Sequence, residues 1–180
     1  MKTRYVTKPL TLIGALAVLV SSTLLAHDKY SIKVPDGLAL SEFKGYERWE
    51  LVSVSHPTGS DEVLNVIVAN PLMIEAYTSG IPGNGKPFPD GAMAVKIQYL
   101  PKKSAEAPFD AAIPDKLKDI AVMAKDAERF PDSGGWGYGL FDYDEANDQF
   151  TPNGTGSNCG AACHTIVKAK DYVFTRYEKR

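Results

Sequence analysis

The sequence predicts a single α+β domain, mostly an antiparallel β-sheet with a few short helices. Several segments alternate apolar and polar or small residues with the period of a β-strand, and turn sequences rich in Pro, Gly, Asn and Asp separate them. The 180 residues, 44% of them hydrophobic and 23% charged, suffice for one core and are few for two. No solenoid-type repeat is present, so the composition is that of an ordinary globular domain.

The first elements are expected between residues 41 and 77. Ser41 is a candidate N-cap for a helix that passes into a strand over residues 51–55. Residues 63–69 are apolar and β-branched, which favours a buried strand. Asn70-Pro71 ends that strand with turn chemistry, and a short helix over residues 72–77 follows.

The strand with the clearest pattern covers residues 92–100. A loop over residues 81–91, with three prolines and three glycines, leads into it. One face carries larger apolar side chains and is expected to lie in the core: Met93, Val95, Ile97 and Tyr99. The other face carries smaller or polar side chains: Ala92, Ala94, Lys96 and Gln98.

The second half continues with strands and connections. Residues 101–114 form a polar, proline-bearing connection, and residues 119–126 fit a strand or a helix by periodicity. Residues 136–143 are predicted to be a strand with Trp136, Tyr138 and Leu140 on one side.

Residues 1–26 have the architecture of a signal peptide. Three basic residues precede an uncharged, apolar-rich stretch from Pro9 to Ala26, and cleavage is expected after Ala26. The alternative is a membrane anchor, because the stretch is close to the lower length for a bilayer span and Leu24 is large for a cleavage site. Cleavage would leave residues 27–180 as a periplasmic or secreted domain. Because the removed segment is basic and the whole chain has a net charge of −2, that domain is acidic, which argues against nucleic-acid binding.

The most informative motif is NCGAACHTI, in which His164 directly follows Cys163. A c-type haem is attached by two thiols and ligated by an adjacent imidazole, usually in the pattern C-x-x-C-H. Here Cys159 lies one residue further away, and Gly160 and two alanines fill the interval, so a small loop is expected to present both sulfurs to a flat ring. His164 is the candidate axial ligand of the haem iron.

Two simpler interpretations of this motif stay open. One is a short-range Cys159–Cys163 disulfide with a chance histidine. The other is part of a metal site, although zinc needs more ligands and His27 and His56 lie far away in the sequence.

The chain also resembles a known family over Leu40 to Tyr177. The matching stretches, in order, are FKGYERWELVSVS, FPDGAMAVK, VMAKDAERF, GGWGYGLF, CGAACH and DYVFTRY. Together they resemble the cytochrome P460 family. The resemblance implies a small, strand-rich, secreted haem protein that is usually a homodimer. In that family, P460 proteins oxidise hydroxylamine at a haem with an additional bond from a lysine, whereas cytochromes c′-β lack the bond and bind nitric oxide.

Carried over to this chain, the resemblance makes Lys96, at the end of FPDGAMAVK, the cross-linking lysine. It thereby implies a hydroxylamine oxidoreductase that uses a P460-type haem c, with iron on His164 and an acceptor cytochrome for the electrons. A nitric-oxide-binding or electron-transfer protein of the c′-β type is the alternative. The chain departs from the usual motif at one point, because Gly160 takes the expected place of the first cysteine.

Other residues near these motifs have two interpretations each. Five aromatic side chains are expected either to wall a haem pocket or to fill the core: Trp136, Tyr138, Phe141, Tyr172 and Phe174. Lys125 and Arg129 are expected to meet haem propionates or solvent. No distal acid or base can be assigned from the sequence.

Overall fold

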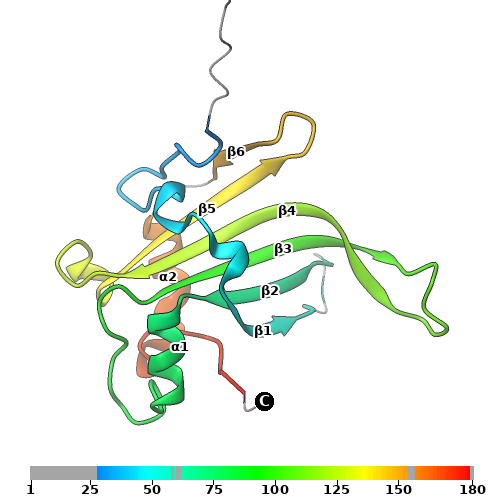
Figure 1. The fold of residues 1–180 in the computed structure, drawn as a ribbon. Coiled ribbons are helices and arrows are strands. Elements are labelled where there is room, and N and C mark those ends of the chain that lie inside the picture. Colours follow the sequence, from blue (N-terminus) through cyan, green and yellow to red (C-terminus); the bar gives the residue numbers. More distant parts are fainter. Residues whose placement is uncertain (1–27, 58, 60–61, 154–156, 179–180) are drawn as a thin grey trace, which may run out of the picture.

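The structure is a computed structural model that describes residues 28–57, 59, 62–153 and 157–178, and these form one six-stranded antiparallel sheet with short helices (Figure 1). The strands lie in the sheet in chain order: β1 (Glu50–Ser55), β2 (Leu64–Ala69), β3 (Met93–Lys103), β4 (Ala112–Lys125), β5 (Trp136–Asp144) and β6 (Gln149–Pro152). The helical elements are α1 (Pro71–Thr78), α2 (Ser157–His164) and the 3-10 turns η1 (Leu40–Phe43), η2 (Tyr46–Arg48), η3 (Pro131–Ser133) and η4 (Thr165–Lys170). The predicted α+β single domain is confirmed.

The predicted signal peptide, residues 1–26, lies outside the described residues. Within the described ranges, no helix has the length and apolar character needed to cross a membrane.

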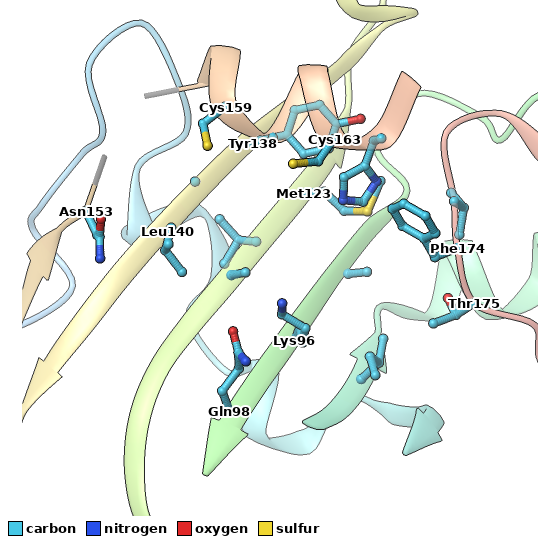
Figure 2. A pocket seen from close by; sticks show the side chains of 18 of the residues that line it. Lys96, Gln98, Met123, Tyr138, Leu140, Asn153, Cys159, Cys163, Phe174 and Thr175 are labelled. Atoms are coloured by element: carbon cyan, nitrogen blue, oxygen red, sulfur yellow. The ribbon is translucent and has the colours of Figure 1, made fainter. Parts of the chain in front are cut away.

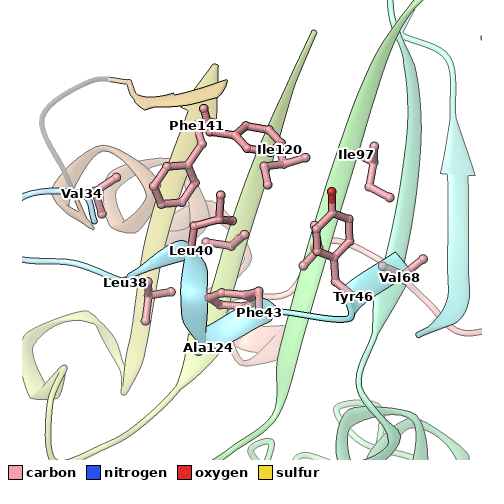
Figure 3. Packing of buried hydrophobic residues seen from close by; sticks show 13 residues of the cluster. Val34, Leu38, Leu40, Phe43, Tyr46, Val68, Ile97, Ile120, Ala124 and Phe141 are labelled. Carbon is pink, nitrogen blue, oxygen red and sulfur yellow. The ribbon is translucent and has the colours of Figure 1, made fainter. Parts of the chain in front are cut away.

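The segment before β1 covers one face of the sheet. In Figure 1 this blue-to-cyan segment crosses the sheet, and Figure 3 shows its side chains packed onto the strands. The resulting core comprises Val34, Leu38, Leu40, Phe43, Tyr46, Val68, Val95, Ile97, Ile120, Val122, Ala124, Phe141 and Phe150. Because side chains alternate along a strand, Val95 and Ile97 lie on this face, as the pattern of residues 92–100 predicts.

The opposite face is covered by α1, α2 and the C-terminal segment. A second core joins α1, through Met73, Ala76 and Tyr77, to sheet residues such as Ala94 and Met123. Asn70 caps α1 by accepting a hydrogen bond from Met73 N–H at 3.0 Å, as an N-cap asparagine does. This second face carries the candidate site.

The helix predicted from Ser41 is replaced by two 3-10 turns, η1 and η2. Gly45 lies between them with φ 88°, a left-handed conformation that interrupts an α-helix. Ser41 is also not the cap: η1 begins at Leu40 and follows Ala39, whose N–H donates to Oε1 of Glu42 at 2.8 Å.

The predicted connection over residues 101–114 is shorter than expected, because β3 and β4 continue as a hairpin arm (Figure 1). Pro101 pairs with Pro114 next to a register irregularity. Beyond Tyr99, β3 no longer pairs with β2, so the missing N–H of Pro101 breaks no hydrogen bond on that side. The ambiguous residues 119–126 are strand up to Lys125.

Lys125 forms a buried clamp with Asp171 instead of a solvent or propionate contact. Its Nζ donates to Oδ1 of Asp171 and to the carbonyl of Gly134, both at 2.8 Å. Oδ2 of Asp171 accepts the N–H of Phe88 at 2.7 Å, so one carboxylate joins three segments. Arg129 pairs with Glu42 at 2.7 Å and does not line the pocket described below.

Candidate functional site

A cavity of about 490 Å³ lies between the second face of the sheet, α2 and the C-terminal segment. This volume is in the range of small-molecule and cofactor sites. Its walls are mostly apolar, and Figure 2 shows side chains from β3 and α2 pointing toward one another across it. The lining includes all four residues predicted for the site: Lys96, Cys159, Cys163 and His164.

The two cysteines lie on α2 and not on the predicted loop. Residues four apart on an α-helix share a face, so the spacing of Cys159 and Cys163 places both thiols on the side that lines the cavity (Figure 2). Both thiols are free and exposed, and no bond joins them. A C-x-x-x-C spacing is therefore compatible with two attachment points on one side of a planar ring.

Gly160 explains why the first cysteine lies one residue further from the histidine. A Cβ at position 160 would lie 2.5 Å from Cβ and Cγ of Tyr138 on β5. The helix rests on the sheet at this point, and Ser157 Oγ also accepts the N–H of Tyr138 at 3.1 Å. A cysteine at position 160 would clash with Tyr138, whereas position 159 lines the cavity.

We expect Gly160→Ala to destabilise the protein by about 1–3 kcal/mol, the usual cost of overpacking. At a helix position with free space around it, a Gly→Ala change would stabilise the protein by about 0.5–1 kcal/mol. The sign of the change in unfolding free energy therefore shows whether position 160 is crowded. Urea unfolding measures the change, and Ala162→Ser at an exposed position of α2 is the control. A stabilised Gly160→Ala protein would show that α2 does not rest on Tyr138.

His164 is held with one ring nitrogen available to a ligand. Its Nδ1 lies 2.6 Å from the carbonyl oxygen of Tyr172, and because a carbonyl only accepts, Nδ1 carries the hydrogen. Burial lowers the pKa of His164, which favours the neutral ring. The neutral tautomer leaves the lone pair of Nε2 free, as an iron-binding imidazole requires.

The backbone that holds His164 depends on an unusual turn. Asp171 and Tyr172 both have positive φ, 48° and 63°, and this bend brings the Tyr172 carbonyl to the imidazole. Two rings flank the imidazole, with centroids 4.8 Å away for Tyr138 and 4.9 Å for Phe174. Tyr172 orients His164 through its main-chain carbonyl and not through its side chain. No pattern of side chains in the sequence could therefore have predicted this contact.

The five aromatic residues divide between pocket and core. Tyr138 and Phe174 line the cavity. Trp136 is fully buried against Phe88, and Phe141 lies in the core on the other face. Tyr172 packs beside the second core and acts through its carbonyl.

Lys96 extends from β3, in the floor of the cavity, toward α2 (Figure 2). Its amine is partly buried and interacts electrostatically with Cys163 and with Asp119. Burial is the main cause that lowers the pKa of Lys96. Lys96 is therefore a half-buried amine that lines the cavity on the face predicted for it, opposite the helix that carries the thiols.

A sequence model of the cytochrome P460 family matches residues 43–175, which include every residue of this cavity. The chain belongs to the cytochrome P460 family. It is therefore a c-type haem protein. Among curated proteins, none matches the chain.

The residues present fit a haem. The cavity brings together two free thiols, an imidazole with a free Nε2 and mostly apolar walls. Within the described ranges, no cluster of three or more His, Cys, Asp and Glu side chains could hold a metal ion by itself. A single histidine is instead what an iron carried by a porphyrin needs from the protein. Cys159 and Cys163 would hold the ring, and His164 would bind its iron.

Proposed function

We propose that this protein oxidises hydroxylamine at a haem that carries a third covalent link, from Lys96. The observation that supports the proposal is the position of Lys96, whose amine enters the same cavity as both thiols and His164. A lysine that only faced solvent, the ordinary alternative for a strand, would not line the cavity opposite α2.

The surroundings of Lys96 favour a bond over a free ammonium. Partial burial in the mostly apolar cavity lowers the pKa of the Lys96 amine, although Asp119 and Cys163 act in the opposite direction. The neutral amine is also the form that reacts with an electrophilic carbon. A bond to a ring-edge carbon would replace one N–H bond of the amine and one C–H bond of the ring, with a peroxide as the two-electron oxidant that leaves as water, and it would remove the charge of the amine.

The protein residues would divide the remaining tasks. The thiols of Cys159 and Cys163 would hold the cofactor, and the imidazole of His164 would bind its iron. A bound haem supplies one-electron redox chemistry that side chains lack. Oxidation of hydroxylamine would release its protons to solvent, and an acceptor cytochrome would take the electrons.

A c′-β-type protein that binds nitric oxide is the second candidate. The apolar walls of the cavity, formed by side chains such as Val173 and Phe174, also suit a small, weakly polar gas. The two candidates differ in whether Lys96 is bonded to the haem.

The cellular setting is part of the proposal. Removal of the signal peptide predicted over residues 1–26 would place the domain in the periplasm or outside the cell, where c-type haem proteins meet acceptor cytochromes. A homodimer is the assembly that the family resemblance favours.

We expect Lys96→Leu to fold and to keep a covalent haem, while its ferrous absorption moves from a strongly red-shifted position to that of an ordinary c-type haem. Hydroxylamine oxidation should be lost. Haem staining after denaturation and the visible spectrum of the ferrous protein measure the two properties. Lys103→Leu, at an exposed lysine of the hairpin arm, is the control and should behave as wild type.

Two results would contradict the proposal. Identical ferrous spectra of wild type and Lys96→Leu would exclude the cross-link and favour the nitric-oxide-binding protein. Loss of all haem on denaturation of the wild type would exclude covalent attachment through the cysteines.

A further inference from the structure

The bend that brings the Tyr172 carbonyl to His164 is held from outside the cavity. Asp171 and Tyr172 follow one another with left-handed backbone angles, φ 48° and 63°, which are unfavourable above all for a bulky residue such as Tyr172. Backbone angles of this kind persist where the surrounding structure imposes them. Contacts with two distant residues do so here, because Asp171 is bound to Lys125 and Tyr172 packs on Gly134.

The first contact is the buried clamp between Lys125 and Asp171. Lys125 Nζ lies 2.8 Å from Oδ1 and 3.0 Å from Oδ2 of Asp171. The N–H of Phe88 donates to Oδ2 of the same carboxylate at 2.7 Å. Only 7% of Lys125 and 12% of Asp171 is exposed, so water is a poor substitute for either partner. The clamp therefore ties the bend at Asp171 to the end of β4.

The second contact is the packing of the Tyr172 ring on Gly134. A Cβ at position 134 would overlap this ring, so the close approach requires glycine. The carbonyl of Gly134 also accepts a hydrogen bond from Lys125 Nζ at 2.8 Å. Lys125 is thus bonded both to the residue before Tyr172 and to the residue against which the Tyr172 ring packs.

The position of this bend determines a hydrogen bond to the imidazole of His164. The Tyr172 carbonyl oxygen lies 2.6 Å from Nδ1, which is shorter than most N–H···O bonds. Donation from the second nitrogen of a metal-binding histidine raises the basicity of the ring. A more basic axial ligand stabilises ferric over ferrous iron, so a displaced carbonyl would change the reduction potential of a haem on His164.

We infer that Lys125, Asp171 and Gly134 are positioning residues that hold the Tyr172 carbonyl on His164 and thereby keep the reduction potential of the haem low. None of the three lines the cavity, so they act on the cofactor through Tyr172 and His164. The inference requires a haem whose iron is bound by His164. It requires neither the Lys96 link nor the oxidation of hydroxylamine, and so goes beyond the proposed function.

The test measures the reduction potential and the iron–histidine stretching vibration of the haem-loaded protein. Lys125→Met and Asp171→Asn should each shift the ferric–ferrous equilibrium about tenfold toward the ferrous form, which is a potential about 59 mV higher for one electron. The stretching frequency, from resonance Raman spectra of the ferrous protein, should fall because the imidazole becomes a weaker base. Lys125→Arg keeps the cation and should move both values back toward wild type.

Gly134→Ala tests the second contact without removing a charge. The added methyl group should displace the Tyr172 ring and reproduce the changes in potential and frequency that Lys125→Met causes. Gly134→Ala and Asp171→Asn, in which asparagine tolerates the left-handed φ, also provide the two measurements if Lys125→Met fails to fold.

Two control variants separate this effect from a general loss of stability. Arg129→Met breaks a different ion pair, with Glu42, and Tyr172→Phe keeps both the ring and the main-chain carbonyl. Both should have the potential and the stretching frequency of wild type.

Wild-type values in folded Lys125→Met, Asp171→Asn and Gly134→Ala proteins would overturn the inference and show that these residues only stabilise the fold. An equal change in Arg129→Met would overturn it as well, because the effect would then follow stability in general. Neither result bears on the proposed function, which fails instead if Lys96→Leu leaves the ferrous spectrum unchanged.

Discussion

Replacing His164 with Ala should abolish the normal haem spectrum while the haem stays bonded to the chain. Cys159 and Cys163 line the cavity independently of the imidazole, so covalent attachment does not need it. The axial bond does, because Nε2 of His164 is the nitrogen left free when Nδ1 donates to Tyr172. Haem staining and the peptide mass of the segment with both cysteines should therefore be retained, whereas the visible spectrum should change.

Two further measurements make this prediction specific. His56→Ala, an exposed position outside the cavity, should leave the spectrum intact. Free imidazole should partly restore the spectrum of His164→Ala, because removal of the side chain opens space between Tyr138 and Phe174. A normal spectrum in His164→Ala together with a changed spectrum in His56→Ala would contradict the assignment of His164 and identify His56 as the iron ligand.

The strand pattern predicted the floor of the site well. Alternation over residues 92–100 assigned Lys96 and Gln98 to the face opposite Val95 and Ile97, and the structure confirms this division. The reason is that the two faces of β3 pack against different surroundings. The larger apolar side chains lie in the core, and the smaller or polar side chains line the cavity. The alternation of side chains along this one strand was therefore sufficient to predict which of them line the cavity.

The helix that carries the cysteines was not predictable in the same way. Residues 157–164 are short, and their apolar side chains are small, so no amphipathic pattern distinguishes a helix from a loop. The helix is fixed by a tertiary contact, the close approach of Gly160 to Tyr138. Tertiary contacts of this kind override local propensity and leave no periodic signal.

Strand register aligns Asn65, Gln98 and Asp119 in a polar row on the second face of the sheet, and this row was missed because it exists only through register. Asn65, Gln98 and Asp119 lie in three separate strands, and each is an ordinary polar residue within its own segment. A shift of one residue in either pairing would move a member of the row to the other face. Sequence order cannot specify that alignment before the pairing of the strands is known.

The ion pair between Lys125 and Asp171 shows that the partner of a charged residue could not be predicted from the sequence either. The sequence analysis expected Lys125 to meet a haem propionate or solvent. Its partner is instead Asp171, which lies 46 residues away in the sequence. Both side chains are largely buried, with 7% of Lys125 and 12% of Asp171 exposed. The Lys125 amine also lies 5.1 Å from the centroid of the Trp136 ring, a cation–π distance. These contacts connect the end of β4 to the turn that positions the Tyr172 carbonyl.

Breaking this clamp should be among the most destabilising single changes in the protein. Lys125→Met leaves the Asp171 carboxylate buried without its cation, and Asp171→Leu leaves the Lys125 amine buried without its anion. Removal of one partner of a buried pair costs about 3–5 kcal/mol. Urea unfolding should therefore show a much lower midpoint with little change in slope for either variant.

The double variant Lys125→Met/Asp171→Leu distinguishes a charge effect from simple loss of packing. Because it removes both buried charges, it should be more stable than the sum of the single effects predicts. Lys103→Met, at an exposed pair with Asp110, should have little effect. Additive losses in the double variant would show that the two side chains act through separate contacts. The turn at Asp171 would then have to be held by its backbone, and the position of His164 would not depend on the clamp.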